Sequence, residues 1–397
     1  MKELTIKTSS YKVFLLLFLG MLTAFGPFVT DMYLPALPSM VEEFGTTTSM
    51  IQLSLTSCMI GLAIGQLIFG PMSDRYGRRP VLIGTLICFT MSTLLCLLSI
   101  DIHLFVILRF FQGTAAAGSI VIARSISTDM FTGHRLAKML AIIGSISGIA
   151  PVLAPVVGGT ITETYGWEGI FTILLIIGIL LSYSSFHYQE TLPMERRVQS
   201  TFFHILKYFK PLWKKRPYMG YVMQLGFAQA ALFANIASAP FIMQQHYGFT
   251  SFQFSIVFGL NSLIIVISAA LATKFRPIKK ATSWGGAGLL IFAICEAIAL
   301  YTEASFWIYE LFMIGILFSL GLCFTSSTTL AMDEGRELSG SASALLGAVS
   351  FAFGGIVSPL VGIGNPLYAT GSVFVVCAVC SLFCIFLTNK CCKTSLQ

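Results

Sequence analysis

GPMSDRYGRRP, residues 70–80, is a short and strongly charged segment in a chain that is otherwise mostly apolar. Apolar runs lie directly before and after it, at about residues 50–71 and 80–100, and each is long enough to cross a bilayer as one helix. Gly70 and Gly77 permit a tight turn, and Asp74 and Arg78 can form a charge-assisted pair. The segment therefore predicts a short connection between two membrane-spanning helices.

The same alternation of apolar runs and polar breaks continues along the chain in both directions. The runs fall at approximately 13–37, 50–71, 80–100, 103–123, 137–162, 166–186, 218–242, 252–273, 282–301, 306–330, 340–362 and 367–388. A chain of 397 residues has room for these spans and for little else. We therefore predict an all-α integral membrane protein of twelve helices that is not an enzyme.

The composition supports this class. Hydrophobic residues make up 56% of the chain and charged residues only 10%, whereas soluble domains have about 45–50% and about 25%. The net charge of +7 is spread over short clusters between apolar runs, so we expect no nucleic-acid partner. Cys377, Cys380 and Cys384 lie in an apolar helix without a nearby His or carboxylate, so we expect no metal site and no cofactor.

The basic residues also predict the orientation. With the N-terminus in the cytoplasm, 23 of the 24 Lys and Arg residues fall on the cytoplasmic side, and the remaining one, Arg109, lies inside the fourth span. A helix added or missed in the middle would place later basic clusters outside. Both termini are therefore predicted to be cytoplasmic.

The longest polar stretch divides the spans into six and six. We predict an N-terminal six-helix bundle at 1–188, a basic cytoplasmic linker at 189–217 and a C-terminal six-helix bundle at 218–397. Two pseudo-symmetric bundles that rock about a site at the membrane midplane fit this arrangement.

The 70–80 loop resembles the G-x-x-x-D-R-x-G-R-R/K loop of the major facilitator superfamily. The resemblance implies a conformational switch that holds the two halves together at the cytoplasmic face, with the start of span eleven near 339–341 as its partner. The switch would comprise Gly70, Asp74, Arg75, Gly77, Arg78, Arg79 and, beyond span four, Asp129. The alternative is an ordinary basic loop that only sets topology.

Two further motifs resemble the same superfamily. Residues 109–113, RFFQG, match its R-x-x-Q-G motif, and residues 150–159, APVLAPVVGG, resemble its antiporter motif G-P-x-x-G-G. The motif residues in the second stretch are Pro151, Pro155, Gly158 and Gly159. Ala154 stands where that motif usually has Gly, and it keeps a small residue for close helix packing. An ordinary small-residue helix interface is the alternative.

The N-terminal half is most similar to the Bcr/CflA branch of drug/proton antiporters. The resemblance is carried by residues 30–38 (TDMYLPALP), 150–159, 167–171 (WEGIF) and 190–193 (ETLP). It implies proton-driven efflux of amphipathic drugs such as bicyclomycin or phenicols.

Two ionisable residues within the predicted spans are candidates for proton coupling, Asp31 and Arg109. A helix rises 1.5 Å per residue, which places Asp31 roughly 9 Å and Arg109 roughly 6 Å outward of the midplane. A carboxylate beside a fixed guanidinium can change its protonation state when its access to water changes. A permanent structural pair is the alternative.

The second half contains weaker candidates. Glu296 in span nine is expected to extend to the outer membrane interface, because ninth spans of this superfamily are peripheral. The polar residues that could face a substrate cavity are Gln112, Gln224, Asn235 and Asn261, although each could instead join two helices.

These features predict a monomeric proton-coupled exporter of small amphipathic compounds in the bacterial inner membrane, driven by the proton gradient. Its partners would be the drug, protons and the lipid bilayer. The alternatives are an uptake symporter or facilitator for a metabolite, and a membrane receptor that does not transport.

Overall fold

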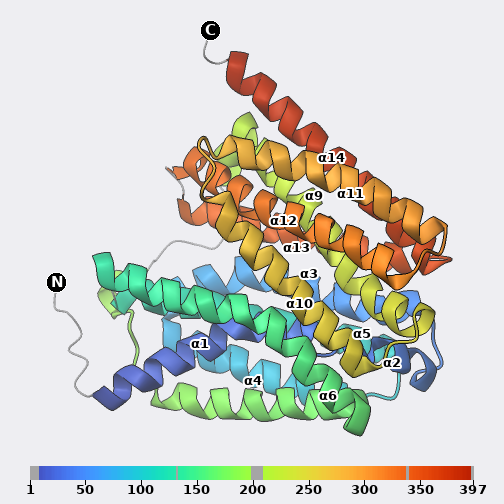
Figure 1. Ribbon diagram of the computed structural model, residues 1–397. Coiled ribbons are helices and arrows are strands. Elements are labelled where there is room, and N and C mark those ends of the chain that lie inside the picture. The colour runs from blue at the N-terminus through green and yellow to red at the C-terminus, as the bar shows by residue number, and fades with distance from the viewer. Residues whose placement is uncertain (1–8, 131–132, 198–208, 337–338, 395–397) are drawn as a thin grey trace. The chain divides into compact units, whose positions relative to one another are not determined.

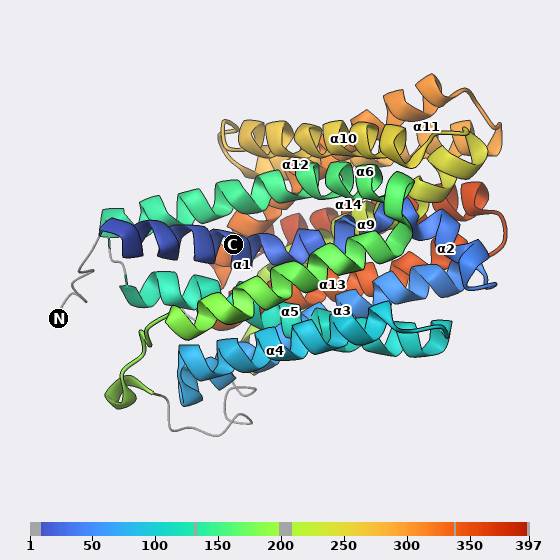
Figure 2. The ribbon, with the colours of Figure 1, turned by 90° about the horizontal axis from the view of Figure 1, so that it is seen from below.

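The computed structural model describes residues 9–130, 133–197, 209–336 and 339–394, and the long elements of these segments are all α-helices (Figure 1). Eleven helices in this part of the chain are long and apolar enough to cross a membrane. One of them belongs to α6 (Gly133–His187), which breaks at Gly166, where φ is 63° and ψ is −163°. The chain turns back there, so α6 contains two antiparallel segments (Figure 2). The predicted all-helical membrane fold is confirmed, and the cytoplasmic position of the termini stays a prediction.

The helices form two compact units, and residues 1–36 and 57–202 make up the first. It contains α1 (Ser9–Asp31), α4 (Arg78–Leu97), α5 (Ile102–Met130), α6 and the later part of α3 (Thr48–Tyr76). α1 packs against α5 and α6, and α4 packs against the same two helices.

Residues 37–56 and 203–397 make up the second unit. Its long helices are α9 (Arg216–Phe241), α10 (Ser251–Ala272), α11 (Lys279–Tyr301), α12 (Phe306–Glu334), α13 (Ser339–Val357) and α14 (Pro366–Thr394). The short elements of the chain are η1 (Leu34–Ala36), α2 (Leu37–Glu43), η2 (Met194–Arg196), α8 (Phe209–Lys214), η3 (Ile242–His246) and η5 (Ser358–Gly362).

The same helix pairing occurs within each unit. The first long helix packs against the fourth and against the last two segments, as α1 does with α5 and α6 and as α9 does with α12, α13 and α14. The third packs against the fourth and the last, as α4 and α11 do. Each unit therefore has the internal pattern of one six-helix repeat. The domain boundaries at residues 188 and 217 stay a prediction.

Small residues allow the helices of the first unit to approach closely. A Cβ atom added at Gly113 would lie 2.1 Å from the backbone oxygen of Cys58, so α5 crosses the later part of α3 at backbone contact. Aromatic rings fill the neighbouring space, where Phe105, Trp167 and Phe171 contact one another with ring centroids 5.4–5.7 Å apart. Close packing of this kind, rather than escape from water, holds helices together in lipid.

Candidate functional site

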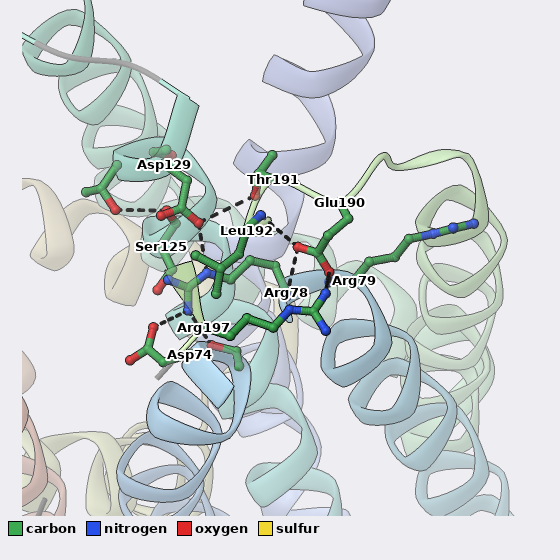
Figure 3. A network of polar contacts seen from close by, with 12 residues as sticks. Asp74, Arg78, Arg79, Ser125, Asp129, Glu190, Thr191, Leu192 and Arg197 are labelled. Atoms are coloured by element: carbon green, nitrogen blue, oxygen red, sulfur yellow. Dashed lines mark hydrogen bonds and ion pairs between the residues drawn. The ribbon is translucent and has the colours of Figure 1, made fainter. Parts of the chain in front are cut away.

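The guanidinium of Arg78 lies at the centre of a polar network in the 70–80 loop (Figure 3). Its Nη1 donates to Asp74 Oδ1 at 2.5 Å and to Ser73 Oγ at 2.7 Å, and its Nε donates to Asp129 Oδ2 at 2.9 Å. The Arg78 side chain is only 7% exposed. Two carboxylates thus surround a nearly buried cation and join the end of α3, the start of α4 and the end of α5.

Glu190 caps the N-terminus of α4 from the segment that follows α6. Its Oε1 accepts a hydrogen bond from the backbone nitrogen of Arg78, and its Oε2 accepts one from that of Arg79, both at 3.0 Å. Arg197 Nη2 lies 3.8 Å from the same Oε2 atom. A carboxylate at this place satisfies backbone N–H groups that have no partner within the helix and complements the helix dipole.

Gly77 makes room for this cap. Its φ of 103° is strained for any residue with a side chain, and an added Cβ atom would lie 2.6 Å from both Glu190 Oε2 and Arg197 Nη2. The sequence indicated a turn glycine at 77 but did not indicate what it faces.

A second connection reaches Asp129 from the segment after α6. The hydroxyl groups of Tyr188 and Thr191 are 2.6 Å apart, and Thr191 Oγ1 donates to Asp129 Oδ2 at 3.5 Å. Burial raises the pKa of the Tyr188 phenol above its ordinary value, so this group stays neutral at physiological pH. The segment that follows α6 is therefore part of the loop network.

The other motif residues of the loop lie at its edge. Arg79 Nη2 donates to the backbone oxygen of Phe186 at 2.7 Å, and Arg75 is exposed with its guanidinium 5.3 Å from the Tyr76 ring centroid. A Cβ atom added at Gly70 would meet only a Val121 methyl group, at 3.4 Å. These residues join helix ends rather than the central charge cluster.

We predict that Glu190→Gln destabilises the first unit. An amide keeps one acceptor oxygen but loses the charge and one of the two acceptors for the α4 terminus, so the free energy of unfolding should fall by about 1 kcal/mol. Thermal unfolding of the purified protein in detergent measures this change. Glu195→Gln, an exposed neighbour in η2, is the matched control. Equal midpoints for Glu190→Gln and the unchanged protein would contradict the capping role.

Arg109 lies inside the first unit with no exposed surface. Its Nη2 donates to the backbone oxygen of Val29 at 3.0 Å, and its Nη1 donates to Gln112 Oε1. The guanidinium carbon lies 4.3 Å from the ring centroid of Tyr33 and 5.6 Å from that of Phe171. Hydrogen bonds and aromatic faces therefore hold this cation without a carboxylate in contact.

Asp31 ends α1 close to this cation and is 7% exposed. Its Oδ1 accepts a hydrogen bond from Thr30 Oγ1 at 2.7 Å, while the hydrogen bonds of Arg109 go to Val29 and Gln112. The Cys58 side chain interacts electrostatically with both Asp31 and Arg109. Asp31 and Arg109 thus belong to one buried region, and the direct ion pair expected from their depths is not formed between these two described residues.

The antiporter motif packs against this region. Pro155, Gly158 and Gly159 are buried and Pro151 is half-buried. A Cβ atom added at Gly158 would lie 1.8 Å from the backbone oxygen of Met32, the residue after Asp31. The motif therefore lets α6 touch the end of α1 where Asp31 lies.

The polar cavity candidates join helices in three different ways. Gln112 accepts from Arg109 and donates to Thr93 Oγ1 at 2.7 Å, so its amide is used inside the first unit. In the second unit, Gln224 donates to Ser381 Oγ at 3.2 Å and accepts from Ser327 Oγ. Both glutamines have the role of helix-to-helix links.

The two asparagines of the second unit keep polar atoms without a partner. Asn235 is 2% exposed and its Oδ1 has no hydrogen bond, and Asn261 is 4% exposed and its Nδ2 has none. A buried amide group in this state has capacity for a further contact.

Glu296 does not extend to the membrane interface, so the expectation from the sequence is wrong. Its side chain has no exposed surface, and neither of its carboxyl oxygens has a hydrogen-bond partner. It interacts electrostatically with Glu310 of α12, which the sequence analysis did not identify. The error arose because a residue near the end of an apolar run can face either lipid or protein, and only the packing of α11 against α12 and α14 decides which.

Comparison with known proteins gives a family and several relatives. The model of the Major Facilitator Superfamily matches residues 16–359. A relative in Bacillus subtilis, described as the uncharacterized MFS-type transporter YdgK, is 38% identical over 89% of this chain and 90% of its own. A bicyclomycin resistance protein homolog of Haemophilus influenzae is 28% identical over 87% of this chain and 88% of its own.

A solved structure has the same fold. The crystal structure of a bacterial homolog of the human lysosomal transporter Spinster superposes with a TM-score of 0.77, covering 96% of this chain and 98% of that chain. The two sequences are 17% identical, so the likeness concerns the fold alone.

Proposed function

The chain belongs to the major facilitator superfamily, and from this premise we propose that it exports small amphipathic drugs in exchange for protons across the bacterial inner membrane. It is a multi-pass transporter and not an enzyme. Bicyclomycin and phenicols are the first compounds to test, because the family branch resembled by the N-terminal half and the resistance protein of H. influenzae both point to them. We propose that it works as a monomer, without a cofactor, and uses the proton gradient as its energy source.

The observation that supports this proposal is the buried region of Asp31 and Arg109. An ionisable carboxyl at membrane depth is costly and is a functional candidate by default. Asp31 has a single hydrogen-bond donor, Thr30, and a fixed cation nearby that bonds elsewhere. A carboxyl held this loosely can gain and lose a proton when its access to water changes, which is the requirement for a proton carrier.

Drug susceptibility of a hypersensitive bacterium that expresses the chain tests the proposal. We expect higher resistance to at least one of these drugs, and a protonophore should abolish the efflux of that drug. Greater drug accumulation in expressing cells would instead indicate uptake. Unchanged susceptibility to every compound of this class would remove drug efflux as the function.

We also propose that the 70–80 loop acts as a conformational switch. Asp74 Oδ1 binds Arg78 while Asp129 holds the same guanidinium from α5, so Asp74 can be changed without releasing Arg78. Asp74 is 44% exposed, and its ion pair contributes about 1 kcal/mol or less. Only a few kcal/mol are needed to shift an equilibrium between two conformations strongly. The side chains of residues 339–341, the suggested partner, lie outside the described part of the chain.

Asp74→Asn should therefore increase the inward-open population and slow turnover, with little change in drug affinity. Labelling of single cysteines on the cytoplasmic side of the transport path measures the population. Glu195→Gln, which removes an exposed carboxyl outside the network, is the control. If labelling of Asp74→Asn does not rise above the control, the loop acts only as a topology signal.

A further inference from the structure

Two carboxyl groups lie together inside the second unit, away from the region of Asp31. Glu296 comes from α11 and Glu310 from α12, two helices that pack side by side (Figure 1). Glu296 has no exposed surface and its two oxygens are unpartnered, and the Oε2 atom of Glu310 is buried and unpartnered as well. The two side chains interact electrostatically.

Two buried donors face these carboxyls without a partner of their own. Tyr309 has no exposed surface, its hydroxyl makes no hydrogen bond, and its phenol interacts with both Glu296 and Glu310. The amide of Asn261, on α10, interacts with Glu310, although its Nδ2 atom has no hydrogen-bond partner. These groups can donate to one negative charge, and the native fold leaves them free to do so.

No basic residue is available to neutralise a second charge. In α11 the nearest basic residues are Lys279 and Lys280, sixteen or more positions from Glu296 and thus roughly 24 Å along the helix. The stretches of α10 and of α14 up to residue 388, which pack against α12 and α11, contain no charged residue.

The remaining titratable neighbour is Tyr247, between η3 and α10. It interacts with Glu296 and donates its hydroxyl hydrogen to the backbone oxygen of Ala304 at 2.9 Å. Burial raises its pKa to about 12, so it stays neutral. His246, whose ring lies 4.7 Å from that of Tyr247, is exposed. The group therefore has a capacity for one charge and two carboxyls to carry it.

We propose that Glu296 and Glu310 form a second proton-binding site, in which the two carboxyls share one proton and Tyr309 and Asn261 stabilise the negative charge that remains. Two ionised carboxylates side by side in a membrane interior without a cation would cost several kcal/mol each, so the pair holds at least one proton. The proton is received and released by a carboxyl oxygen, and no other bond changes.

The position of the pair suggests the side from which protons arrive. Glu296 lies five residues before the end of α11 and Glu310 four residues after the start of α12, so each is within roughly 8 Å of the helix ends that face away from the basic loops. This is the predicted outer side, where the proton concentration of an energised bacterium is higher. The proposal extends the proposed function, because a second site would add a proton to the transport cycle.

Infrared difference spectroscopy of the purified protein during a pH titration tests the site without any transport assay. We expect a carboxylic-acid band that titrates between about pH 5 and pH 9 and amounts to about one proton per molecule. Because the proton is shared, either Glu296→Gln or Glu310→Gln should remove the whole band. Asp31→Asn should leave it in place, and so should Glu303→Gln, an exposed control between the same helices.

Tyr309→Phe separates a proton site from a merely buried acid. It removes one donor to the charged form and no charge, so the band should persist to higher pH. A band that does not titrate, or that each Gln variant only halves, would overturn the shared site. A band that changes when Na⁺ is replaced by choline at constant pH would overturn it in favour of a cation site. None of these outcomes depends on whether the protein exports drugs.

Discussion

Replacing Asp31 with Asn should abolish proton-coupled drug efflux and leave membrane insertion intact. Asn keeps the shape of the side chain and can keep the hydrogen bond from Thr30 Oγ1, but it cannot carry a proton. We therefore expect energised efflux at the background of cells without the transporter. Drug efflux from energised cells measures the effect, and the amount of protein in the membrane fraction shows whether the variant inserts.

Glu42→Gln is a suitable control because it removes an exposed carboxyl of α2, in the segment that follows Asp31. This variant should export as well as the unchanged protein. Energised efflux by Asp31→Asn at the unchanged rate would remove Asp31 from the coupling mechanism, even if the protein remains a drug exporter.

Arg109→Ala should be as damaging as the change at Asp31, for a different reason. It removes two hydrogen bonds from a charged donor, each worth about 1.5–3 kcal/mol, and the contact with the Tyr33 ring. It also leaves the backbone oxygen of Val29 buried without this donor. We expect the free energy of unfolding to fall by about 3 kcal/mol and efflux to be lost.

Arg109→Lys distinguishes the charge from the geometry. A lysine keeps the positive charge but cannot reproduce the two-armed contact to Val29 and Gln112 or the flat contact with Tyr33, so it should restore only part of the activity. Thermal unfolding and efflux rate should both be measured. Full activity with Lys would mean that only the charge matters, and full activity with Ala would exclude Arg109 from the mechanism.

Hydropathy and charge were sufficient to predict the helical spans, because a lipid environment requires about 20 apolar residues for each helix and penalises charge within it. The break at Gly166 coincides with the predicted boundary between the fifth and sixth runs. The group of Asp74, Arg78 and Asp129 was also predicted from the loop motif, since its members lie at the ends of consecutive helices.

Contacts that depend on the rotation of a helix about its axis could not be predicted in this way. A rise per residue gives the depth of Asp31 and Arg109 but not the direction of their side chains, and Arg109 in fact bonds to Val29 and Gln112. Glu190 lies 112 positions after Arg78 in the chain, so its capping bond has no local signal. The burial of Glu296 likewise depends on which face of α11 packs against its neighbours.

The contact between Gly158 and the backbone of Met32 has an evolutionary consequence for the antiporter motif. A glycine codon becomes an alanine codon by a single nucleotide change, and at position 154 this chain indeed has alanine where related motifs have glycine. At position 158 the same change would push a methyl group into a backbone oxygen 1.8 Å away, which no side-chain movement can relieve. The two small-residue positions of the motif are therefore unequal, since one can drift during divergence and the other is fixed by the backbone beside Asp31.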